Sequence, residues 1–538
     1  PGAISIEDLF FVGTRLYAVT HGRGMFSVEL DSVPPPLPPP APPPPPPVPV
    51  AVCKIGPPPA PVANRPAAGP PAPASSFGPV SNQAPRLVAA TGGNGILQIF
   101  DGISLNDSGA VAFAARSTNG EVLYVGNTPT DTRKVNPIFE GPGKTYDGYV
   151  DINNNLKVAA RTRYIGGFPP ATFVELWDGT PAGANAGEIV GRGGAGQTFL
   201  IVNQRVSVND SDNVAYTYLE QSSGGALFGG VAEFQPARGE SDPLKLDQST
   251  AVLYPSLSDD GHIALRDGLS GASPIVLIDP DFGGRKSIAG AGWSDLGWRP
   301  GVSEKAEVVA FAGSLSNTAI VTGAYLDAGP GIFISLDRGA YTGQSGQPRE
   351  LYRIAGIACS GDPGAYEDKS YLRGFVADKP VVVNDKMSGN GRQFSVAYVA
   401  RGAYDAEAVY LTRVTLPDDV TTGKPITPLL QTARIIGVGD IISDTTGAIT
   451  GSLGAIVTLT ISPKMTMRDQ IAIWVQTDTG VQAVLRTGPQ LHRPVLIVPG
   501  IVGTGPADGS IDWWKQRGVD PSQIVMDPLL GVYDDISQ

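Results

Sequence analysis

The side chains that could act as nucleophiles, bases or metal ligands are few and widely spaced in this chain. The cysteines are Cys53 and Cys359, 306 positions apart, and the histidines are His21, His262 and His492. Disulfide frameworks and cysteine-rich metal sites need several cysteines at short spacings, so the sequence excludes both. The dispersed histidines likewise predict no histidine-based metal site, and nothing else in the sequence predicts a cofactor.

One segment near the carboxyl end has the pattern of a buried strand that is followed by a loop. Residues 494–503 read PVLIVPGIVG, and residues 525–535 read VMDPLLGVYDD. A continuous apolar run is typical of a strand buried on both faces of a parallel sheet. The two segments together resemble the opening of lipase-like α/β-hydrolases of the lecithin:cholesterol acyltransferase family, with Thr504 where that family usually has serine.

This resemblance implies a role for the loop that follows the apolar run. In acyl transfer, backbone amides after a strand can donate to the negatively charged oxygen of the tetrahedral intermediate. Gly500 and Ile501 are therefore the candidate oxyanion-hole residues. An ordinary exit from a strand remains the alternative interpretation of this loop.

The catalytic triad of such an enzyme is expected to lie beyond residue 538. In this fold a serine, an acidic residue and a histidine follow the opening strand in that order. The motif G-x-S-x-G occurs nowhere in the 538 residues, and His492 precedes the strand. We therefore expect no catalytic residue in this chain, which we interpret as a fragment of a longer ester hydrolase or acyltransferase.

A repeated pattern fills residues 86–488. Each copy has a polar turn led by Asn or Ser, followed by a short apolar strand such as Val111-Ala112-Phe113. The leading residues are Asn106, Asn153, Asn209, Ser258, Ser303, Asn384 and Ser462, spaced 47, 56, 49, 45, 81 and 78 positions apart. Periods of about 40 to 50 residues with several short strands are typical of β-propeller blades, and the two long spacings indicate insertions.

The number of strands in each unit predicts how the propeller closes. Six units supply four strands each, whereas the seventh stops after residues 481–486 and an unmatched strand, residues 86–92, precedes the first unit. We predict that these two segments pair as the last two strands of one blade, because this closes the ring without an open edge. The predicted fold class is all-β, a seven-bladed β-propeller of four-stranded blades, with a proline-rich linker and a truncated α/β segment at residues 489–538.

The fourth copy of the turn, Ser258-Asp259-Asp260-Gly261-His262, is similar to the repeat of TolB-type bacterial propellers. This resemblance covers residues 86–488 and implies the propeller fold. Clustered Asn and Asp oxygens could also hold calcium. We favour the alternative that they form Asx-turns between strands, because the oxygens are spread over seven blades.

Two shorter regions precede the repeats. Residues 1–31 predict strands on either side of Gly22 and Gly24, and residues 17–26, YAVTHGRGMF, resemble the closing motif of sialidase- or sortilin-type propellers, which implies the remnant of an upstream propeller. Residues 32–85 hold 13 prolines at positions 34–49 and eight at 57–73. Proline lacks an amide donor and fixes φ, so this linker is expected to be a polyproline II spacer.

The net charge and the hydropathy of the chain argue against some classes of binding partner. The net charge is -12, which argues against nucleic acid or an anionic membrane, and no run of 18 apolar residues could span a bilayer. We predict the binding or scaffold region of a larger secreted or surface-exposed bacterial hydrolase, with an unknown protein, glycan or lipid ester bound at the propeller. The alternatives are a non-enzymatic adhesion scaffold and a propeller glycosidase, although no carboxylate pair stands out for the latter.

Overall fold

The computed structural model describes three strands near the amino terminus and most of residues 85–487. The described ranges are 6–12, 15–20, 24–29, and 85–487 except for 136–143, 165–170, 181–186, 195–198, 222–225, 240–243, 250–251, 269, 271–272, 281–283, 316–318, 322–323, 327–328, 338, 340–348, 357–373, 385–392, 402–406, 417–427 and 444–451. All named elements, β1 to β36, are strands. The predicted linker up to residue 84 and the predicted hydrolase segment 489–538 lie outside the described residues.

The strands near the amino terminus form a small antiparallel sheet. β1 (Ile6–Val12) pairs with β2 (Arg15–Thr20), and β2 pairs with β3 (Gly24–Glu29). The strand pattern predicted for residues 1–31 is therefore confirmed. These strands and the propeller strands belong to separate compact units.

The described part of residues 85–487 contains seven antiparallel sheets that are the blades of the predicted propeller, together with one separate two-stranded hairpin. Blade 1 contains β5 (Ile96–Leu105), β6 (Val111–Ser117), β7 (Gly120–Gly126) and β8 (Arg133–Lys134). Blade 2 contains β9 (Lys144–Ile152), β10 (Lys157–Tyr164), β11 (Thr172–Asp178) and β12 (Gly187–Gly193). Blade 3 contains β13 (Ile201–Val208), β14 (Val214–Gln221), β15 (Leu227–Phe234) and β16 (Leu244–Ser249), and blade 4 contains β17 (Val252–Leu257), β18 (Ile263–Asp267), β19 (Ile275–Asp279) and β20 (Gly284–Ala289).

The remaining three blades have additional or divided strands. Blade 5 contains β21 (Trp293–Leu296), β22 (Gly301–Val302), β23 (Val308–Leu315), β26 (Gly329–Asp337) and β27 (Arg349–Gly356), and a separate hairpin of β24 (Ala319–Val321) and β25 (Ala324–Leu326) is inserted in it. Blade 6 contains β28 (Gly374–Phe375), β29 (Val381–Val383), β30 (Gln393–Arg401), β31 (Glu407–Thr415) and β32 (Leu429–Gly437). Blade 7 contains β33 (Ile441–Ser443), β34 (Ser452–Met465), β35 (Ile471–Thr477), β36 (Gln482–Thr487) and β4 (Pro85–Ala90). The hairpin β24–β25 confirms an insertion in the fifth unit.

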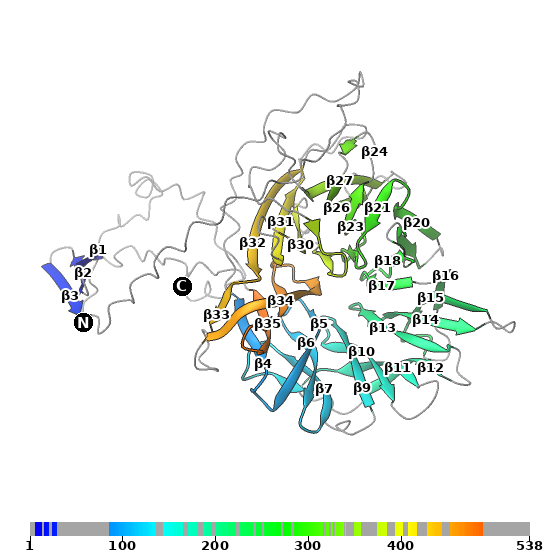
Figure 1. Cartoon of the computed structure of the whole chain (residues 1–538), viewed down its shortest axis with the longest axis horizontal. Helices are drawn as coiled ribbons and strands as arrows, with labels where there is room; N and C mark the ends of the chain where they lie inside the picture. Colours follow the sequence, from blue (N-terminus) through cyan, green and yellow to red (C-terminus); the bar gives the residue numbers. More distant parts are fainter. Residues whose placement is uncertain are drawn as a thin grey trace, which may run out of the picture. The chain divides into compact units, whose positions relative to one another are not determined.

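The blades are arranged around a common axis (Figure 1). Their innermost strands contact one another in the cyclic order β5, β9, β13, β17, β22, β29, β34 and back to β5. The predicted closure of this ring is confirmed, because β4 is the outermost strand of blade 7 and pairs antiparallel with β36. In this pairing Leu87 lies opposite Leu485, and the amide of Thr91 extends the ladder with a 2.9 Å bond to the carbonyl of Gln482.

The hydrophobic core is divided into seven clusters, one between each pair of neighbouring blades. Successive side chains of a strand point to opposite faces of its sheet, so each central strand contributes to two clusters. In β6, Val111 and Phe113 pack between blades 7 and 1, whereas Ala112 and Ala114 pack between blades 1 and 2. Burial on both faces explains why the central strands are continuously apolar in sequence.

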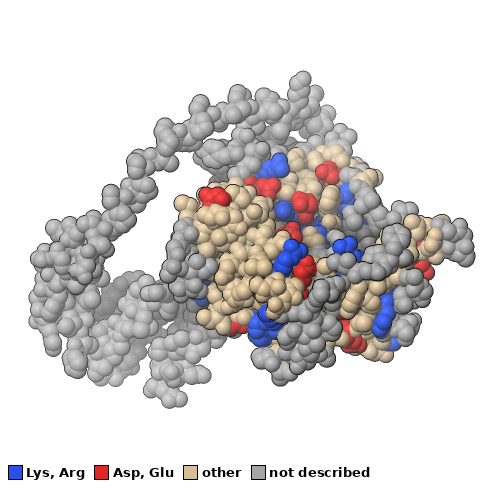
Figure 2. Space-filling model, turned by 60° about the horizontal axis from the view of Figure 1, so that its bottom comes forward, with Lys and Arg blue, Asp and Glu red and all other residues tan. Residues whose placement is uncertain are grey.

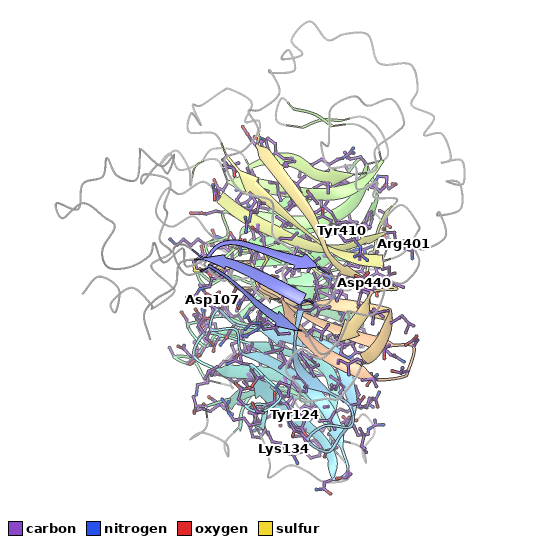
Figure 3. All side chains as sticks on the ribbon, turned by 90° about the vertical axis from the view of Figure 1, so that its left-hand side faces the viewer. Asp107, Tyr124, Lys134, Arg401, Tyr410 and Asp440 are labelled. Atoms are coloured by element: carbon purple, nitrogen blue, oxygen red, sulfur yellow. The ribbon has the colours of Figure 1, made fainter. Side chains whose placement is uncertain are left out.

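Tyr124 and Tyr410, which are labelled in Figure 3, each belong to a stacked aromatic pair at a blade interface. The ring of Tyr124 lies 5.3 Å from that of Phe113 in blade 1, and the ring of Tyr410 lies 5.9 Å from that of Tyr398 in blade 6. Each pair joins two adjacent strands of one blade through directly opposed residues. Cross-strand pairs of this kind add to the stability of the sheet beyond the area they bury.

Candidate functional site

The polar turns that define the repeat are closed by their own leading side chains. The Oδ1 atoms of Asn106, Asn153 and Asn209 accept the backbone amide four residues later at 2.9, 2.8 and 3.0 Å. In blade 6, Oδ1 of Asn384 accepts the amide of Ser395 at 2.7 Å in the same way. Oδ1 of Asn209 also accepts the amide of Ser211, two residues later, at 3.1 Å, which is the bond of an Asx-turn. Among the described residues, no three His, Cys, Asp or Glu side chains cluster in a way that could hold a metal.

The seventh turn begins at Thr466, so the prediction that it begins at Ser462 was wrong. The amide of Thr466 donates to the carbonyl of Gln470 at 3.0 Å, and the amide of Asp469 donates to the carbonyl of Thr466 at 3.0 Å, as in the other turns. Residues 462–464 lie instead in a bulge of β34. A bulge holds extra residues without ending the strand, and its Ser-Pro pair has the local composition of a turn.

A first set of hydrogen bonds joins four of the seven turns to the turn of the next blade. The Nδ2 atom of the leading asparagine donates to the carbonyl of the next leading residue: Asn106 to Asn153 at 3.0 Å, Asn153 to Asn209 at 2.8 Å, Asn209 to Ser258 at 3.0 Å, and Asn384 to Thr466 at 3.0 Å. All of these asparagines are buried. The asparagine of the repeat therefore has two structural roles, because one end of its amide closes the turn and the other end fixes the neighbouring blade.

A second set of hydrogen bonds links the residues directly after the leading ones in blades 7, 1, 2, 3 and 4. The amides of Asp107, Asn154 and Asp210 donate to the side chains of Asn154, Asp210 and Asp259 at 2.8, 2.8 and 2.9 Å, and the amide of Met467 donates to Asp107 at 2.9 Å. The Asn154 side chain also donates to the carboxylates of Asp107 and Asp210 at 3.0 and 2.7 Å. These carboxylates therefore accept hydrogen bonds from backbone and side-chain amides of neighbouring turns, and the bonds fix the positions of adjacent blades.

Variants of Asn209 separate its two roles. Asn209→Ser keeps an oxygen that can close the turn, as Ser303 does in blade 5, where its Oγ accepts the amide of Val308 at 3.1 Å. The variant removes the donor to blade 4, so the free energy of unfolding should fall by about 1 kcal/mol. Asn209→Ala removes both bonds and leaves buried groups unsatisfied, and we expect a fall of about 2 to 3 kcal/mol. Urea unfolding of the full chain measures both. Lys286→Ala, at an exposed position of β20, is the control, and equal losses in the two Asn209 variants would contradict the division of roles.

An axial cavity of about 90 Å³ lies where the seven innermost strands converge. All seven strands contribute to its lining, which includes Asn106, Asn153, Ser256, Asn384 and Lys464. Strands that form the inner edge of a propeller have backbone groups without a strand partner on that side. Side chains satisfy several of these groups: the amides of Ile152, Val208, Leu257 and Val302 are bonded by Ser104, Asp151, Ser207 and Ser256, each from the preceding blade, at 3.4, 2.7, 3.2 and 3.3 Å.

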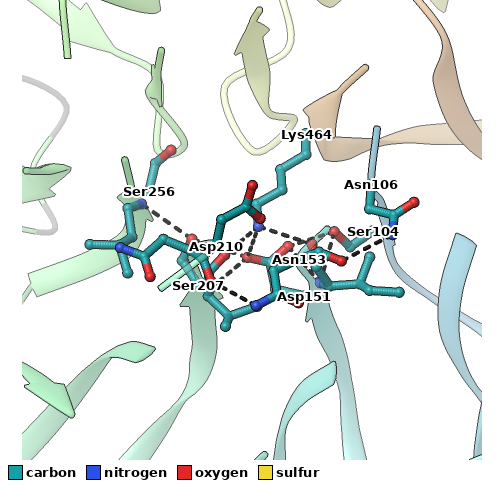
Figure 4. A network of polar contacts seen from close by, with 12 residues as sticks. Ser104, Asn106, Asp151, Asn153, Ser207, Asp210, Ser256 and Lys464 are labelled. Carbon is teal, nitrogen blue, oxygen red and sulfur yellow. Dashed lines mark hydrogen bonds and ion pairs between the residues drawn. The ribbon is translucent and has the colours of Figure 1, made fainter. Parts of the chain in front are cut away.

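Lys464 reaches across this axis from blade 7 to blades 2 and 3 (Figure 4). Its Nζ lies 2.9 Å from Oδ2 of Asp151, donates to the carbonyl of Ile152 at 3.0 Å, and also donates to the carbonyl of Val208. The Asp151 side chain is 1% exposed and also accepts the hydroxyls of Ser104 and Ser207 at 2.5 and 3.1 Å. The buried ion pair is therefore surrounded by hydrogen bonds that compensate its desolvation.

The two charged residues occupy the same position of the repeat in different blades. Counting from the observed turns, Ser104, Asp151, Ser207, Ser256 and Lys464 each stand two residues before the leading residue. Sequence analysis missed Lys464 because the seventh turn was aligned at Ser462. The signal that could have identified it is a charged residue where most other blades have a small one.

Carboxylates lie close to the lysine in the lining of the axial cavity. Asp107, Asp210, Asp259 and Glu304 all line it, together with Lys464. Burial raises the pKa of Asp259, and the charge of Asp210 adds to the rise, while the hydrogen bond from the Asp210 amide and the charge of Lys464 oppose it. The cavity is consequently polar, and the negative charges on its wall outnumber the one lysine.

Outside the axis, the one described histidine belongs to the fourth turn. Nδ1 of His262 lies 3.0 Å from a carboxylate oxygen of Asp260, and this carboxylate raises the pKa of His262 above its usual value, against the effect of burial. The predicted oxyanion-hole residues Gly500 and Ile501 lie outside the described residues. At the propeller axis, the structure brings together Asp151 and Lys464, which sequence analysis did not single out.

Comparison with known proteins finds solved structures that resemble this chain, but no related sequence. No protein-family model matches the chain, and no curated protein matches it. A putative TolB from Agrobacterium tumefaciens is 13% identical, with a TM-score of 0.29 over 57% of this chain and 85% of that one. Prolyl oligopeptidase B from Galerina marginata is 10% identical, with a TM-score of 0.40 over 74% of this chain and 48% of that one.

A third solved structure, the uncharacterized protein lmo1340 from Listeria monocytogenes, is 10% identical, with a TM-score of 0.33 over 66% of this chain and 88% of that one. At these levels of identity the comparisons do not assign a family. The sheet order, the cyclic contacts of the innermost strands and the β4–β36 pairing show that residues 85–487 form a seven-bladed β-propeller.

Proposed function

We propose that the propeller is the binding or scaffold module of a larger exported bacterial protein of the lipase-like α/β-hydrolase kind. The observation that supports a binding role is the axial cavity. The seven blades share one sequence pattern, but the side chains of Lys464 and Asp151 at this cavity differ from those at the same repeat position in the other blades. The ion pair of Lys464 and Asp151 joins blade 7 to blade 2 and breaks the approximate symmetry of the ring. A ligand in the cavity would therefore bind in one orientation. A non-enzymatic adhesion or interaction scaffold would use the same cavity.

The size and polarity of the cavity restrict the chemical class of ligand that it can bind. A volume of about 90 Å³ admits only a few non-hydrogen atoms, so a ligand would place a terminal polar group there and contact the rim with the rest. Hydrogen-bonding groups, one lysine and several carboxylates favour a peptide or glycan end over a lipid chain. On the face drawn in Figure 2, basic side chains of the described residues are interspersed with acidic ones, which agrees with a ligand of low charge.

Peptide and glycan arrays probed with the full chain test this proposal. We expect a defined set of ligands to be bound by the wild type and to lose at least about tenfold in affinity with Lys464→Gln, because the one positive charge among the lining residues of the cavity is lost. Lys379→Gln, which changes a lysine of blade 6 that the cavity lining does not include, is the control. Binding that is equal in wild type and Lys464→Gln would show that the axial cavity is not the ligand site.

The hydrolase part of the proposal rests on the resemblance of residues 489–538. We expect the chain to show no turnover of p-nitrophenyl esters, because an oxyanion loop without a nucleophile and base leaves a rate orders of magnitude below that of the intact enzyme. A chain extended by about 250 residues, the size of one α/β domain, should be active. Turnover by the present chain that is lost on substitution of Gly500 or Ile501 would place the active site within it.

Export is proposed from the proline-rich spacer, the low cysteine content and the propeller architecture. In the described part of the chain, no helix is long and apolar enough to cross a membrane. Fractionation of the producing cells should recover the protein at the surface or in the medium. Recovery with the cytoplasmic fraction would contradict this part of the proposal.

A further inference from the structure

Two arginines lie at matching irregularities of the innermost strands. The pairing of β13 with β14 is interrupted by a bulge between Val202 and Val206, and Arg205 lies in it. In blade 5, Arg299 lies between β21 and β22, where the innermost strand is divided. Bulges turn side chains out of the sheet and are common near binding sites. Both arginines stand four residues before the leading residue of their blade.

Aromatic rings from the neighbouring blades pack against both guanidinium groups. Tyr149 of blade 2 and Tyr254 of blade 4 occupy the corresponding irregular positions of β9 and β17. The guanidinium carbon of Arg205 lies against the ring of Tyr149 and 4.4 Å from the centre of the Tyr254 ring. That of Arg299 lies 5.0 and 4.7 Å from the same two rings. Two cations therefore share two aromatic faces.

The charge of this pair is not balanced by direct contacts within the described residues. Nη1 of Arg205 and Nε of Arg299 are buried without a hydrogen-bond partner, and no carboxylate of the described residues lies within 4.0 Å of either guanidinium. Asp101 acts on both arginines, and Asp378 on Arg299, only from a longer distance. Burial, followed by the charge of Arg299, lowers the pKa of Arg205 to about 8, and burial also lowers the pKa of Arg299.

Bringing two like charges together in a half-buried position is unfavourable unless a counter-charge binds there. Cation–π contacts stabilise each guanidinium but leave the net positive charge in place. A planar guanidinium offers parallel donors that match the oxygens of a carboxylate or phosphate. We propose that Arg205 and Arg299 form a binding site for an oxyanion, a carboxylate or phosphate group, held between Tyr149 and Tyr254.

Part of the site reaches the protein surface. Tyr149, Arg205, Tyr254 and Arg299 are half-buried, and Trp298, whose ring stacks on Tyr254 at 6.3 Å, is 38% exposed. Val206 and Pro255, which follow Arg205 and Tyr254 in the chain, line the axial cavity. The oxyanion site therefore lies beside that cavity but uses other residues, so it is independent of the ligand proposed for Lys464.

Thermal unfolding and calorimetric titration of the full chain test the site. Sodium phosphate and sodium acetate are compared with sodium chloride at equal ionic strength, which separates a phosphate from a carboxylate preference. We expect saturable binding and a rise in Tm with at least one of the two anions. Arg205→Gln and Arg299→Gln should each weaken binding at least about tenfold, since each removes charge-assisted bonds. Arg434→Gln, an exposed arginine paired with Asp440 at 2.8 Å, should bind like the wild type.

A second measurement needs no variant and decides the question if an arginine variant does not fold. Phenylglyoxal modification of the wild type, followed by peptide mass spectrometry, should show slower reaction of Arg205 and Arg299 when phosphate or acetate is present, with Arg434 unaffected. The proposal is overturned if neither anion binds beyond the chloride reference, if the arginine variants bind as the wild type does, or if the anions leave the modification of Arg205 and Arg299 unchanged.

Discussion

Removal of residues 85–91 is expected to lower the free energy of unfolding of the propeller by at least about 5 kcal/mol, which is comparable to the whole stability of many domains. These residues are the outer strand of blade 7, and Leu87, Val88, Ala89 and Ala90 are each no more than 5% exposed. Burial of one Leu or Val side chain contributes about 1.5 to 3 kcal/mol. The deletion also turns β36 into an open edge, which invites pairing between molecules.

Urea unfolding followed by circular dichroism, together with light scattering for association, measures this effect. Leu87→Asp offers the same test in a full-length chain, because Leu87 packs between blades 6 and 7 and has no room for a charge. Arg86→Gln is the matched control, since Arg86 is exposed on the same strand. An unchanged midpoint for the deletion would mean that the ring is held by its inner strands and not by its closing strand.

Breaking the axial ion pair should have the next largest effect. Asp151→Ser or Lys464→Met leaves one charge in a largely buried position without its partner, and such changes cost about 3 to 5 kcal/mol. Asp151→Ser with Lys464→Met restores the small polar residue that blades 1, 3 and 4 have at this position and removes both charges. Because desolvation offsets much of the attraction in buried pairs, the double variant should be more stable than either single variant.

The double-mutant cycle is measured by urea unfolding at constant pH and salt. We expect a coupling of at least about 2 kcal/mol between the two positions, because the Nζ of Lys464 lies 2.9 Å from the carboxylate. Arg413→Gln and its partner Asp469, joined at 3.0 Å between blades 6 and 7, provide a pair away from the axis for comparison. Additive effects at positions 151 and 464 would show that the two side chains do not interact in solution.

The sequence alone determined the blade architecture. Each blade repeats a local arrangement, in which an Asx-turn precedes a strand that is buried on both faces, and both features depend on residues close together in the chain. Strand counting then identified residues 86–92 as the missing strand of the seventh blade, because a closed ring must pair every strand. The structure confirms this with β4 beside β36.

Only the tertiary structure decided which residues meet at the axis. Local composition placed the seventh turn at Ser462, whereas the bulge in β34 moves it to Thr466 and turns Lys464 toward Asp151, 313 positions earlier in the chain. The approach of Arg205 to Arg299 depends in the same way on irregular positions in separate blades. Contacts between residues of distant blades depend on how the blades are arranged around the axis. A local sequence pattern does not determine which of these residues come close together.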